Sequence, residues 1–494
     1  MRSPRLLNRA IALAIAGVPV ALCIAVGSAR AQATAAGDKV PITTSSEDAR
    51  KLYLEGRDLA EKLRATDARR FYEQAVAKDK DFALAYVGLA GTSGTAKEFF
   101  DSVSQAAALA GRVSEGERHL VLGLDAGAKG DPAGQERHYT ELVRLFPRDE
   151  RAHNLLGNVY FGRQEYATAV KHYVEATRIN PSFSPSYNQL GYAYRTLEKY
   201  ADAETAFKKY IELIPNDSNP YDSYAELLMK TGRFEESIRN YEKALTLDPN
   251  FVASYVGIGS NRLHMGRPDQ ARATFAKLAG IARTTGERRQ ALFWTAAAYV
   301  QEGATEKAIG ELQKGYAIAE SSHDLASMSG DLNQIGDVLR EAGRPDEALT
   351  KYTESVSMME KAQVPEEVKE ATRRNHLFEE ARIALAKNDV ATAKVKGAEY
   401  ARQAAVKKVP FEVRQQHELA GMLALAEKQY STAVEELKRA NQQDPRVLYL
   451  MALAFQGAGD TEQARAFAAK AAKFNGLSFN SAFVRAKAQK MATS

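Results

Sequence analysis

Histidine is the side chain in this sequence best suited to chemistry, because it serves as a metal ligand and transfers protons near neutral pH. Four of the eight histidines form two pairs 34 residues apart: His119 with His153, and His138 with His172. A helical metal site needs a second ligand four residues further on, and none of the four has a histidine or carboxylate there. His417 and Glu418 begin a zinc-protease motif, but Gly421 stands where the second histidine is required. We therefore expect no metal ion and no cofactor.

Other catalytic signatures fail on their spacing. The glycine-rich stretch from Gly91 to Lys97 lacks the Gly-Lys-Ser/Thr ending of a phosphate-binding loop. Gly257-Ile258-Gly259 falls in a helical pattern, whereas a dinucleotide-binding loop follows a strand. The sequence contains no Gly-x-Ser-x-Gly nucleophile motif. It therefore indicates a protein that is not an enzyme.

A repeat of 34 residues organises most of the chain, and a period of this length is typical of a solenoid. One column holds small residues: Gly123, Gly157, Gly191, Ala225 and Gly259. Sixteen residues later comes an aromatic column: Tyr139, Tyr173, Phe207, Tyr241 and Phe275. Prolines close four of the units: Pro147, Pro181, Pro215 and Pro249. Columns that stay in phase over so many units are not a chance pattern.

Within each unit, apolar and small residues recur at helical spacing, which predicts two antiparallel helices joined by a short turn, as at 162–165. We expect Gly191 to let the second helix approach, with Ala203 facing it and Phe207 filling the space beside that contact. Pro215 should end the second helix, since the residue before a proline is pushed out of the helical region. The period and its columns resemble the tetratricopeptide repeat family. The resemblance implies an all-α superhelical solenoid of about twelve helix-turn-helix units, followed by a C-terminal capping helix.

The resemblance also implies where a partner would bind. In this family the first helix of each unit lines a concave groove through set positions. The corresponding residues here are Asn154, Asn158, Phe161, Asn188, Tyr192, Arg195, Asp222, Glu226, Met229 and Lys230. Asparagine amides both donate and accept hydrogen bonds, so spaced asparagines could hold the backbone of an extended peptide. The alternative is a polar helix face that is merely solvated.

Trp294 is the only tryptophan and falls at a groove-side position next to Phe293. Two interpretations stay open for it. The ring is either buried in the junction between repeats, or it is an aromatic anchor for a partner.

The quality of the repeats divides the chain into segments. We predict a signal peptide at 1–31, a flexible leader at 32–48, degenerate repeats at 49–115, regular repeats at 116–285, repeats with longer connections at 286–413, C-terminal repeats at 414–473 and a capping helix at 474–494. The period stretches through 284–289, 321–328 and 358–370, where we expect the longer connections.

The N-terminus has the features of an export signal. Three arginines among the first nine residues precede an apolar run from Ala10 to Val26, and Ala29-Arg30-Ala31 supplies the small-x-small pattern of a cleavage site. Cleavage after Ala31 would leave a periplasmic or secreted chain without cysteine, since Cys23 is the only one. The alternative is an uncleaved N-terminal anchor. A lipid on Cys23 is disfavoured, because Leu22 stands where lipoprotein signals place a small residue.

The charge of the chain excludes some partner classes. It has 67 basic and 62 acidic residues, a net charge of +5, which falls to +1 without the four arginines of residues 1–31. A nearly neutral chain gives no reason to expect nucleic acid or an anionic membrane as a partner. No other stretch approaches 18 apolar residues, so we expect no membrane insertion after signal removal. We expect a scaffold that binds a protein or extended peptide in its groove. The alternative is a small-ligand receptor or an unrecognised enzyme that uses a pocket in the stretched repeats.

Overall fold

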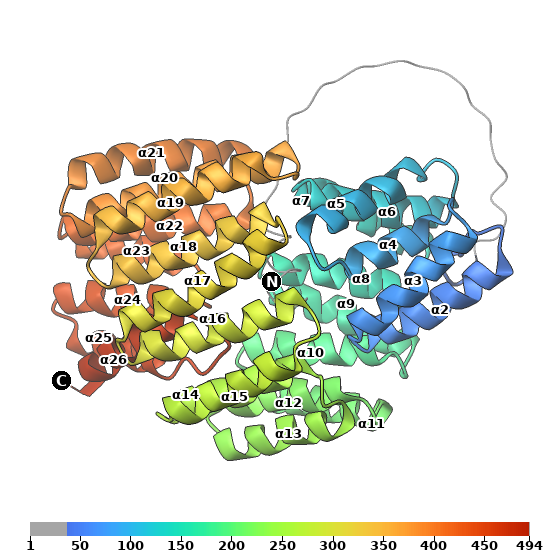
Figure 1. Ribbon diagram of the computed structural model, residues 1–494, viewed down its shortest axis with the longest axis horizontal. Coiled ribbons are helices and arrows are strands. Elements are labelled where there is room, and N and C mark those ends of the chain that lie inside the picture. Colours follow the sequence, from blue (N-terminus) through green and yellow to red (C-terminus); the bar gives the residue numbers. More distant parts are fainter. Residues whose placement is uncertain (1–36, 494) are drawn as a thin grey trace. The chain divides into compact units, whose positions relative to one another are not determined.

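A computed structural model describes residues 37–493, which form 25 helices and no strand (Figure 1). The predicted all-α fold is therefore confirmed for this part of the chain. The predicted signal peptide and residues 32–36 of the leader lie outside the described residues. The chain divides after Pro215 into two compact units, and each is described by itself.

The first unit, residues 37–215, contains ten helices. They are α2 (Glu47–Glu61), α3 (Ala65–Lys78), α4 (Ala83–Gly91), α5 (Ala96–Ala108), α6 (Glu115–Ala128), α7 (Pro132–Leu145), α8 (Glu150–Gly162), α9 (Tyr166–Ile179), α10 (Ser184–Thr196) and α11 (Tyr200–Leu213).

The second unit, residues 216–493, contains fifteen helices. They are α12 (Ser218–Lys230), α13 (Phe234–Leu247), α14 (Val252–His264), α15 (Pro268–Ile281), α16 (Thr285–Gln301), α17 (Thr305–Ser321), α18 (Leu325–Glu341), α19 (Pro345–Lys361), α20 (Glu366–Ala386), α21 (Val390–Lys407), α22 (Pro410–Ala426), α23 (Tyr430–Arg439), α24 (Pro445–Gly457), α25 (Thr461–Ala472) and α26 (Asn480–Thr493).

Aromatic rings on the second helix of a repeat lie directly over glycines on the first. A Cβ atom on Gly191 of α10 would lie 2.5 Å from the ring of Phe207 on α11, and Gly157 has the same relation to Tyr173. Only a residue without Cβ allows this approach. The predicted helix pairs are confirmed, but the group nearest to the missing Cβ of Gly191 is the Phe207 ring and not Ala203.

The turns within successive repeats share one backbone conformation. Gln164, Glu198 and Gly232, 34 residues apart, have φ angles of 66°, 59° and 80°. This left-handed residue reverses the chain, so that the next N–H bonds back into the last helical turn. Arg233 N, for example, donates to Leu228 O at 2.8 Å. The short turns predicted from the sequence are confirmed.

The stretched region lengthens its helices and not its connections. Helices α16 to α22 have 17 to 21 residues, whereas α8 to α11 have 13 or 14. The prediction of longer connections is therefore wrong. One physical reason is visible at α16, where Thr284 and Glu287 form a capping box that starts the helix inside the stretch expected to be a loop.

Residues 37–46, which we call the N-terminal strap, are held against the first unit. Val40 N donates to Asp149 Oδ2 at 2.8 Å, and Thr43 N donates to Glu117 Oε1 at 2.6 Å. The Glu117 side chain is fully buried, so it requires such donors. The prediction of a flexible leader is wrong for this part of it.

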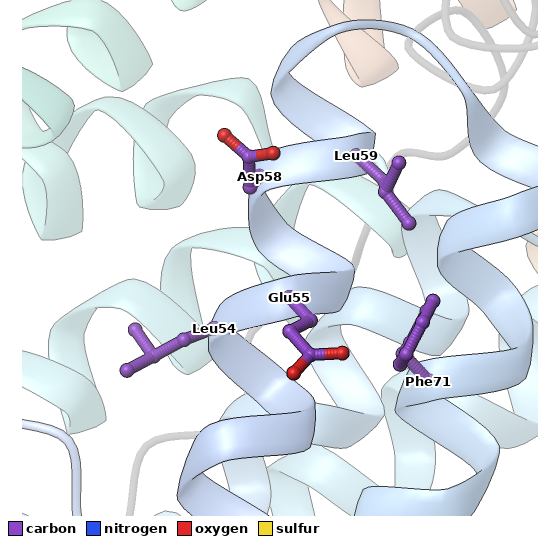
Figure 2. A pocket seen from close by; sticks show the side chains of 5 residues that line it. All are labelled: Leu54, Glu55, Asp58, Leu59 and Phe71. Atoms are coloured by element: carbon purple, nitrogen blue, oxygen red, sulfur yellow. The ribbon is translucent and has the colours of Figure 1, made fainter.

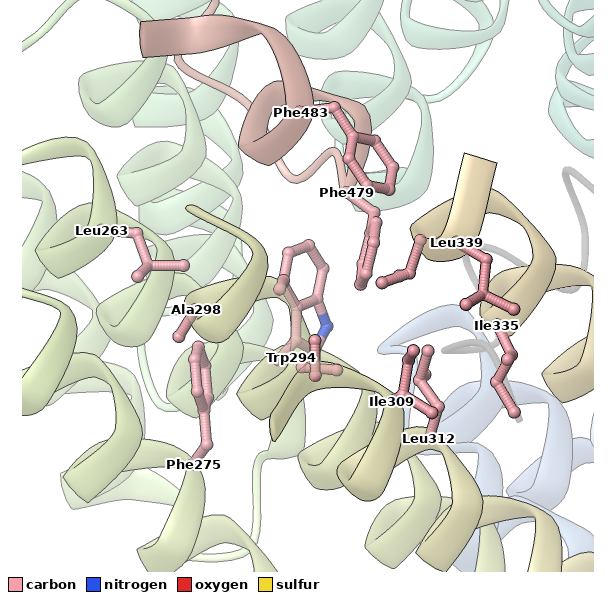
Figure 3. Packing of buried hydrophobic residues seen from close by; sticks show 14 of the residues in the cluster. Leu263, Phe275, Trp294, Ala298, Ile309, Leu312, Ile335, Leu339, Phe479 and Phe483 are labelled. Carbon is pink, nitrogen blue, oxygen red and sulfur yellow. The ribbon is translucent and has the colours of Figure 1, made fainter. Parts of the chain in front are cut away.

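The C-terminal helix α26 does more than cap the last repeat. It packs on α24 and α25, as expected of a cap, and also on α16. Phe479 and Phe483 join the hydrophobic cluster that contains Trp294 (Figure 3). Trp294 is only 4% exposed, so the interpretation of Trp294 as a buried residue is confirmed and that of an open anchor is wrong.

Candidate peptide-binding surface

Six of the ten predicted groove residues lie on α8 and α10, two adjacent first helices of the first unit. Asn154 Oδ1 accepts a hydrogen bond from Ser186 Oγ at 3.0 Å, and Asn158 Oδ1 accepts one from the Tyr173 hydroxyl at 2.8 Å. Neither amide nitrogen donates to any residue in 37–493. The carbonyl groups thus join neighbouring helices, while the NH₂ groups stay available to a ligand.

Asn188, unlike Asn154 and Asn158, is buried. Its side chain is 5% exposed, and its buried Oδ1 has no hydrogen-bond partner within residues 37–493. A buried acceptor left without a donor costs about 1–3 kcal/mol. A ligand does not reach this oxygen, so the expectation that Asn188 lines an open groove is wrong.

Aromatic side chains lie on the same faces as these amides. Tyr192 follows Asn188 by four residues, and Phe161 follows Asn158 by three, so each pair shares one helix face. The Arg195 guanidinium lies 4.7 Å from the centroid of the Tyr192 ring. Both aromatic rings are partly exposed. They can offer apolar contact beside the polar amides.

The other four predicted residues lie on α12 in the second unit, and they do not form an open surface. Asp222, Glu226 and Met229 are 1%, 6% and 1% exposed. Lys230 Nζ lies 4.2 Å from the centroid of the Phe474 ring. The expectation of a solvated groove is wrong for the three buried residues, and a role in binding stays a prediction for all ten.

The four histidines singled out in the sequence pair within repeats and not between them. His119 Nδ1 lies 3.1 Å from His138 Nδ1, and His153 Nδ1 lies 3.5 Å from His172 Nδ1. His153 Nε2 is 3.2 Å from the Pro147 carbonyl, so this nitrogen carries the proton and Nδ1 is the acceptor. A spacing of 19 residues, from one helix to its hairpin partner, was the signal that would have found these contacts.

The surroundings of His119, His138 and His172 disfavour protonation. Burial lowers the pKa of His119, and the charge of Arg118 lowers it further. Burial also lowers the pKa of His138 and His172, and in both the histidine partner is the second cause. The described residues contain no group of three histidine, cysteine, aspartate or glutamate side chains arranged to hold a metal. We therefore interpret the pairs as packing contacts between the two helices of a repeat.

Acidification from about pH 7.5 to about 5 is expected to destabilise the first unit. Histidines in unfolded chains titrate near about 6.5, above their lowered pKa values in the folded unit. Between these values the unfolded chain binds more protons than the folded unit. The stabilisation from these histidines is therefore complete above about pH 6.5, and it is lost as the pH falls through the folded pKa values. Each histidine contributes at most about 1.4 kcal/mol per pH unit within this window. Melting curves recorded across the window measure the slope.

A double variant tests the origin of that slope. His138→Gln together with His172→Gln should flatten the dependence of melting temperature on pH. His323→Asn is the matched control, because His323 is exposed on a turn with φ of 55°, which asparagine adopts readily. An unchanged slope in the double variant would assign the pH dependence to other groups.

The stretched repeats contain a cavity of about 60 Å³ between α20, α22 and α24. Charged side chains line much of it, among them Glu379, Arg382, Glu418 and Arg446. Small-molecule sites usually have about 300–1,000 Å³, whereas this volume suits about two water molecules. The alternative of a small-ligand pocket in these repeats gains no support from this cavity.

A larger hollow of about 470 Å³ lies on the first repeat (Figure 2). Its lining residues are Leu54, Glu55, Asp58, Leu59 and Phe71. Figure 2 shows Leu59 and Phe71 pointing toward each other between α2 and α3. None of the predicted groove residues contributes to it.

No helix in the described part of the chain is both long and apolar enough to span a bilayer.

Four family models match the sequence where the repeats are regular. One, described as a TPR repeat, matches residues 157–198. Three described as tetratricopeptide repeats match 184–217, 219–251 and 256–323. No curated protein matches the chain.

Several solved structures are similar to parts of the chain. A tetratricopeptide repeat protein from Parabacteroides merdae is 16% identical, with 55% of this chain and 94% of that one covered and a TM-score of 0.36. PilF from Pseudomonas aeruginosa is 17% identical, with coverages of 52% and 92% and a TM-score of 0.29. YrrB, described as a TPR protein with an unusual peptide-binding site, is 19% identical, with coverages of 36% and 91% and a TM-score of 0.26.

Proposed function

Since the chain is a tetratricopeptide repeat protein, we propose that it is a non-enzymatic scaffold that binds a protein or extended peptide along α8 and α10. One observation carries the proposal: Asn154 and Asn158 on α8 are accessible and present amide NH₂ groups that donate to no described residue. The backbone of a peptide supplies the C=O groups that these donors need.

The proposed contacts favour an extended peptide over a folded surface. Backbone N–H and C=O groups of an extended chain are free to pair with side-chain amides, whereas those of a helix are already bonded within it. Tyr192 and Phe161 would cover apolar side chains of the same peptide. Affinity would then depend little on the peptide's sequence.

Two substitutions should weaken partner binding without disturbing the fold. Asn154→Asp and Asn158→Asp each remove an NH₂ donor but keep an oxygen for Ser186 Oγ and for the Tyr173 hydroxyl. Each should cost roughly 0.5–1.5 kcal/mol of binding free energy. The partner would be captured from cell-envelope extract with the wild-type protein, and calorimetric titration would then compare the variants.

Arg178→Ala serves as the control, because Arg178 is exposed on α9 and pairs only locally with Glu175 at 2.6 Å. It should bind the partner like the wild type. Wild-type affinity in a folded Asn154→Asp, Asn158→Asp double variant would remove this surface from the binding site.

For localisation, we propose export to the periplasm or beyond. The supporting features are the basic N-terminus, the apolar run and the small-x-small pattern ending at Ala31. Mass spectrometry of the protein from a cell-envelope fraction should find a mature chain that begins at Gln32. An acylated N-terminus at Cys23 would contradict both the cleavage site and the absence of a membrane anchor.

A further inference from the structure

The C-terminal segment, residues 474–493, returns to repeats more than 180 positions earlier in the chain. Its contacts with the first helices of those repeats are Phe474 with Lys230 of α12, Arg485 with His264 of α14, and Phe479 with Phe293 of α16. All of these residues belong to the second unit. A simple cap would touch only α24 and α25.

The contacted residues occupy equivalent places in successive repeats. Lys230 and His264 are 34 residues apart and each lies at the end of a first helix. Lys230 is also one of the positions that the repeat pattern assigns to a partner. The C-terminal segment therefore covers the helix face on which a ligand was expected. We call this face, formed by α12, α14 and α16, the helix-binding face.

The apolar part of the contact has the pattern of a helix in a groove. Phe479 and Phe483 are four positions apart, are each 8% exposed, and have ring centroids 5.3 Å from one another. The Phe479 ring lies 4.7 Å from the ring of Phe293. Figure 3 shows Phe479, which directly precedes α26, and Phe483 of α26 beside Trp294. Anchors spaced in this way on one face are typical of amphipathic helices in hydrophobic grooves.

The polar part of the contact contains a buried positive charge that no carboxylate neutralises. Arg485 is 7% exposed, and its guanidinium donates to His264 Nδ1 at 2.8 Å and to the Phe474 carbonyl at 3.0 Å. No carboxylate among residues 37–493 pairs with it. Burial lowers the pKa of Arg485 to about 10 and that of His264 to about 3. A buried cation without a counter-charge is costly, which weakens the docking of α26.

Two further donors stay unsatisfied in the docked state. Trp294 Nε1 and Arg485 Nε are buried without a hydrogen-bond partner among the described residues. Each such group opposes burial. The apolar anchors thus hold the segment in place, while the polar groups favour its release.

We propose that the helix-binding face is a site for an amphipathic helix with two aromatic residues four positions apart, and that residues 474–493 occupy it until such a partner helix displaces them. The segment is then an intramolecular ligand that keeps the site closed. This site is separate from the one on α8 and α10, which belongs to the other unit.

A labelled peptide in trans tests the proposal on the full-length protein. The probe is a fluorescein-labelled synthetic peptide of residues 474–493. A tethered segment competes at a millimolar effective concentration, so wild-type protein should bind the probe weakly. Phe479→Ala together with Phe483→Ala removes the anchors of the resident segment, and this variant should bind the probe at least about tenfold more tightly by fluorescence anisotropy.

Two controls isolate the effect of the anchors. Gln489→Ala with Lys490→Ala changes exposed residues of the same helix and should bind the probe as weakly as the wild type. A probe with both phenylalanines replaced by alanine should not bind the opened variant. Equal binding of the two probes, or no binding to the folded variant, would overturn the proposal.

If the variant with Phe479→Ala and Phe483→Ala does not fold, hydrogen exchange of the wild-type protein tests whether residues 474–493 dock reversibly. Reversible docking predicts that the amides of α26 exchange at least about tenfold faster than those of α24 and α25, because α26 opens alone. Equal exchange rates would identify α26 as a fixed cap and reject the proposal. Either result leaves the test on Asn154 and Asn158 unaffected.

Discussion

Replacing Arg374 by methionine is expected to lower the free energy of unfolding of the second unit by about 3–5 kcal/mol. Arg374 is 2% exposed on α20, and its Nε and Nη2 donate to the Glu412 carboxylate on α22 at 2.9–3.1 Å. Glu412 is itself only 4% exposed. Removing the arginine therefore leaves a carboxylate buried without its cation. Urea unfolding followed by the fluorescence of Trp294, the only tryptophan, reports on this unit.

Two comparisons separate the buried charge from other effects of the substitution. Arg374→Met with Glu412→Leu replaces the whole pair by apolar groups and should recover most of the lost stability. Arg402→Met breaks a pair of similar geometry, with Glu399 at 2.6–2.8 Å, on the exposed side of α21. That change should cost less than about 1 kcal/mol. Equal losses from Arg374→Met and Arg402→Met would rule out burial as the cause.

Gly191→Phe is expected to destabilise the first unit by about 1–3 kcal/mol or more. Even a Cβ atom at this position would lie 2.5 Å from the Phe207 ring, so α10 and α11 would have to separate. Hydrogen exchange of the amides in these two helices should show the loss directly. Within the first unit, the effect should reach α8 and α9, the preceding repeat, more than α2 and α3, because repeats couple through their shared interfaces.

Gly162→Ala is the matched control for this prediction. Gly162 is the last residue of α8, and no atom lies within 4 Å of the place where its Cβ would be. Alanine there should leave the unit as stable as before, or stabilise it by up to about 1 kcal/mol. The smaller pair Gly191→Ala with Phe207→Leu should restore part of the loss of Gly191→Ala alone. Failure of that rescue would show that the Phe207 ring is not the obstacle.

The helix pairs were predictable because their determinants are local and recur every 34 residues. A glycine, an aromatic ring sixteen positions later and a turn between them are enough to specify a hairpin, as Gly157, Tyr173 and Gln164 illustrate. The stretched region was harder to predict. There the period changes, and whether added residues continue a helix depends on caps such as Thr284.

The sequence predicted on which helices the candidate site residues lie, but not how far each side chain is buried. Column offsets place Asn188 on a first helix, but its burial depends on residues of neighbouring repeats. The 34-residue spacing of His119 and His153 did not indicate which histidines touch, because His119 meets His138 across a hairpin. The return of Arg485 to His264 spans 221 positions and has no local signal.

The N-terminal strap changes how the first repeats can open. In a stack of repeats that touch only their neighbours, the end repeats fray first, since each loses a single interface. The strap instead joins Thr43 to Glu117, 74 positions later, and Val40 to Asp149, 109 positions later. Opening α2 far enough to pull the strap away would break bonds to α6 and to the cap of α8 at the same time. The strap therefore ties the first repeat to α6 and α8 of the same unit. The first unit should unfold cooperatively, without separate fraying of its N-terminal repeat.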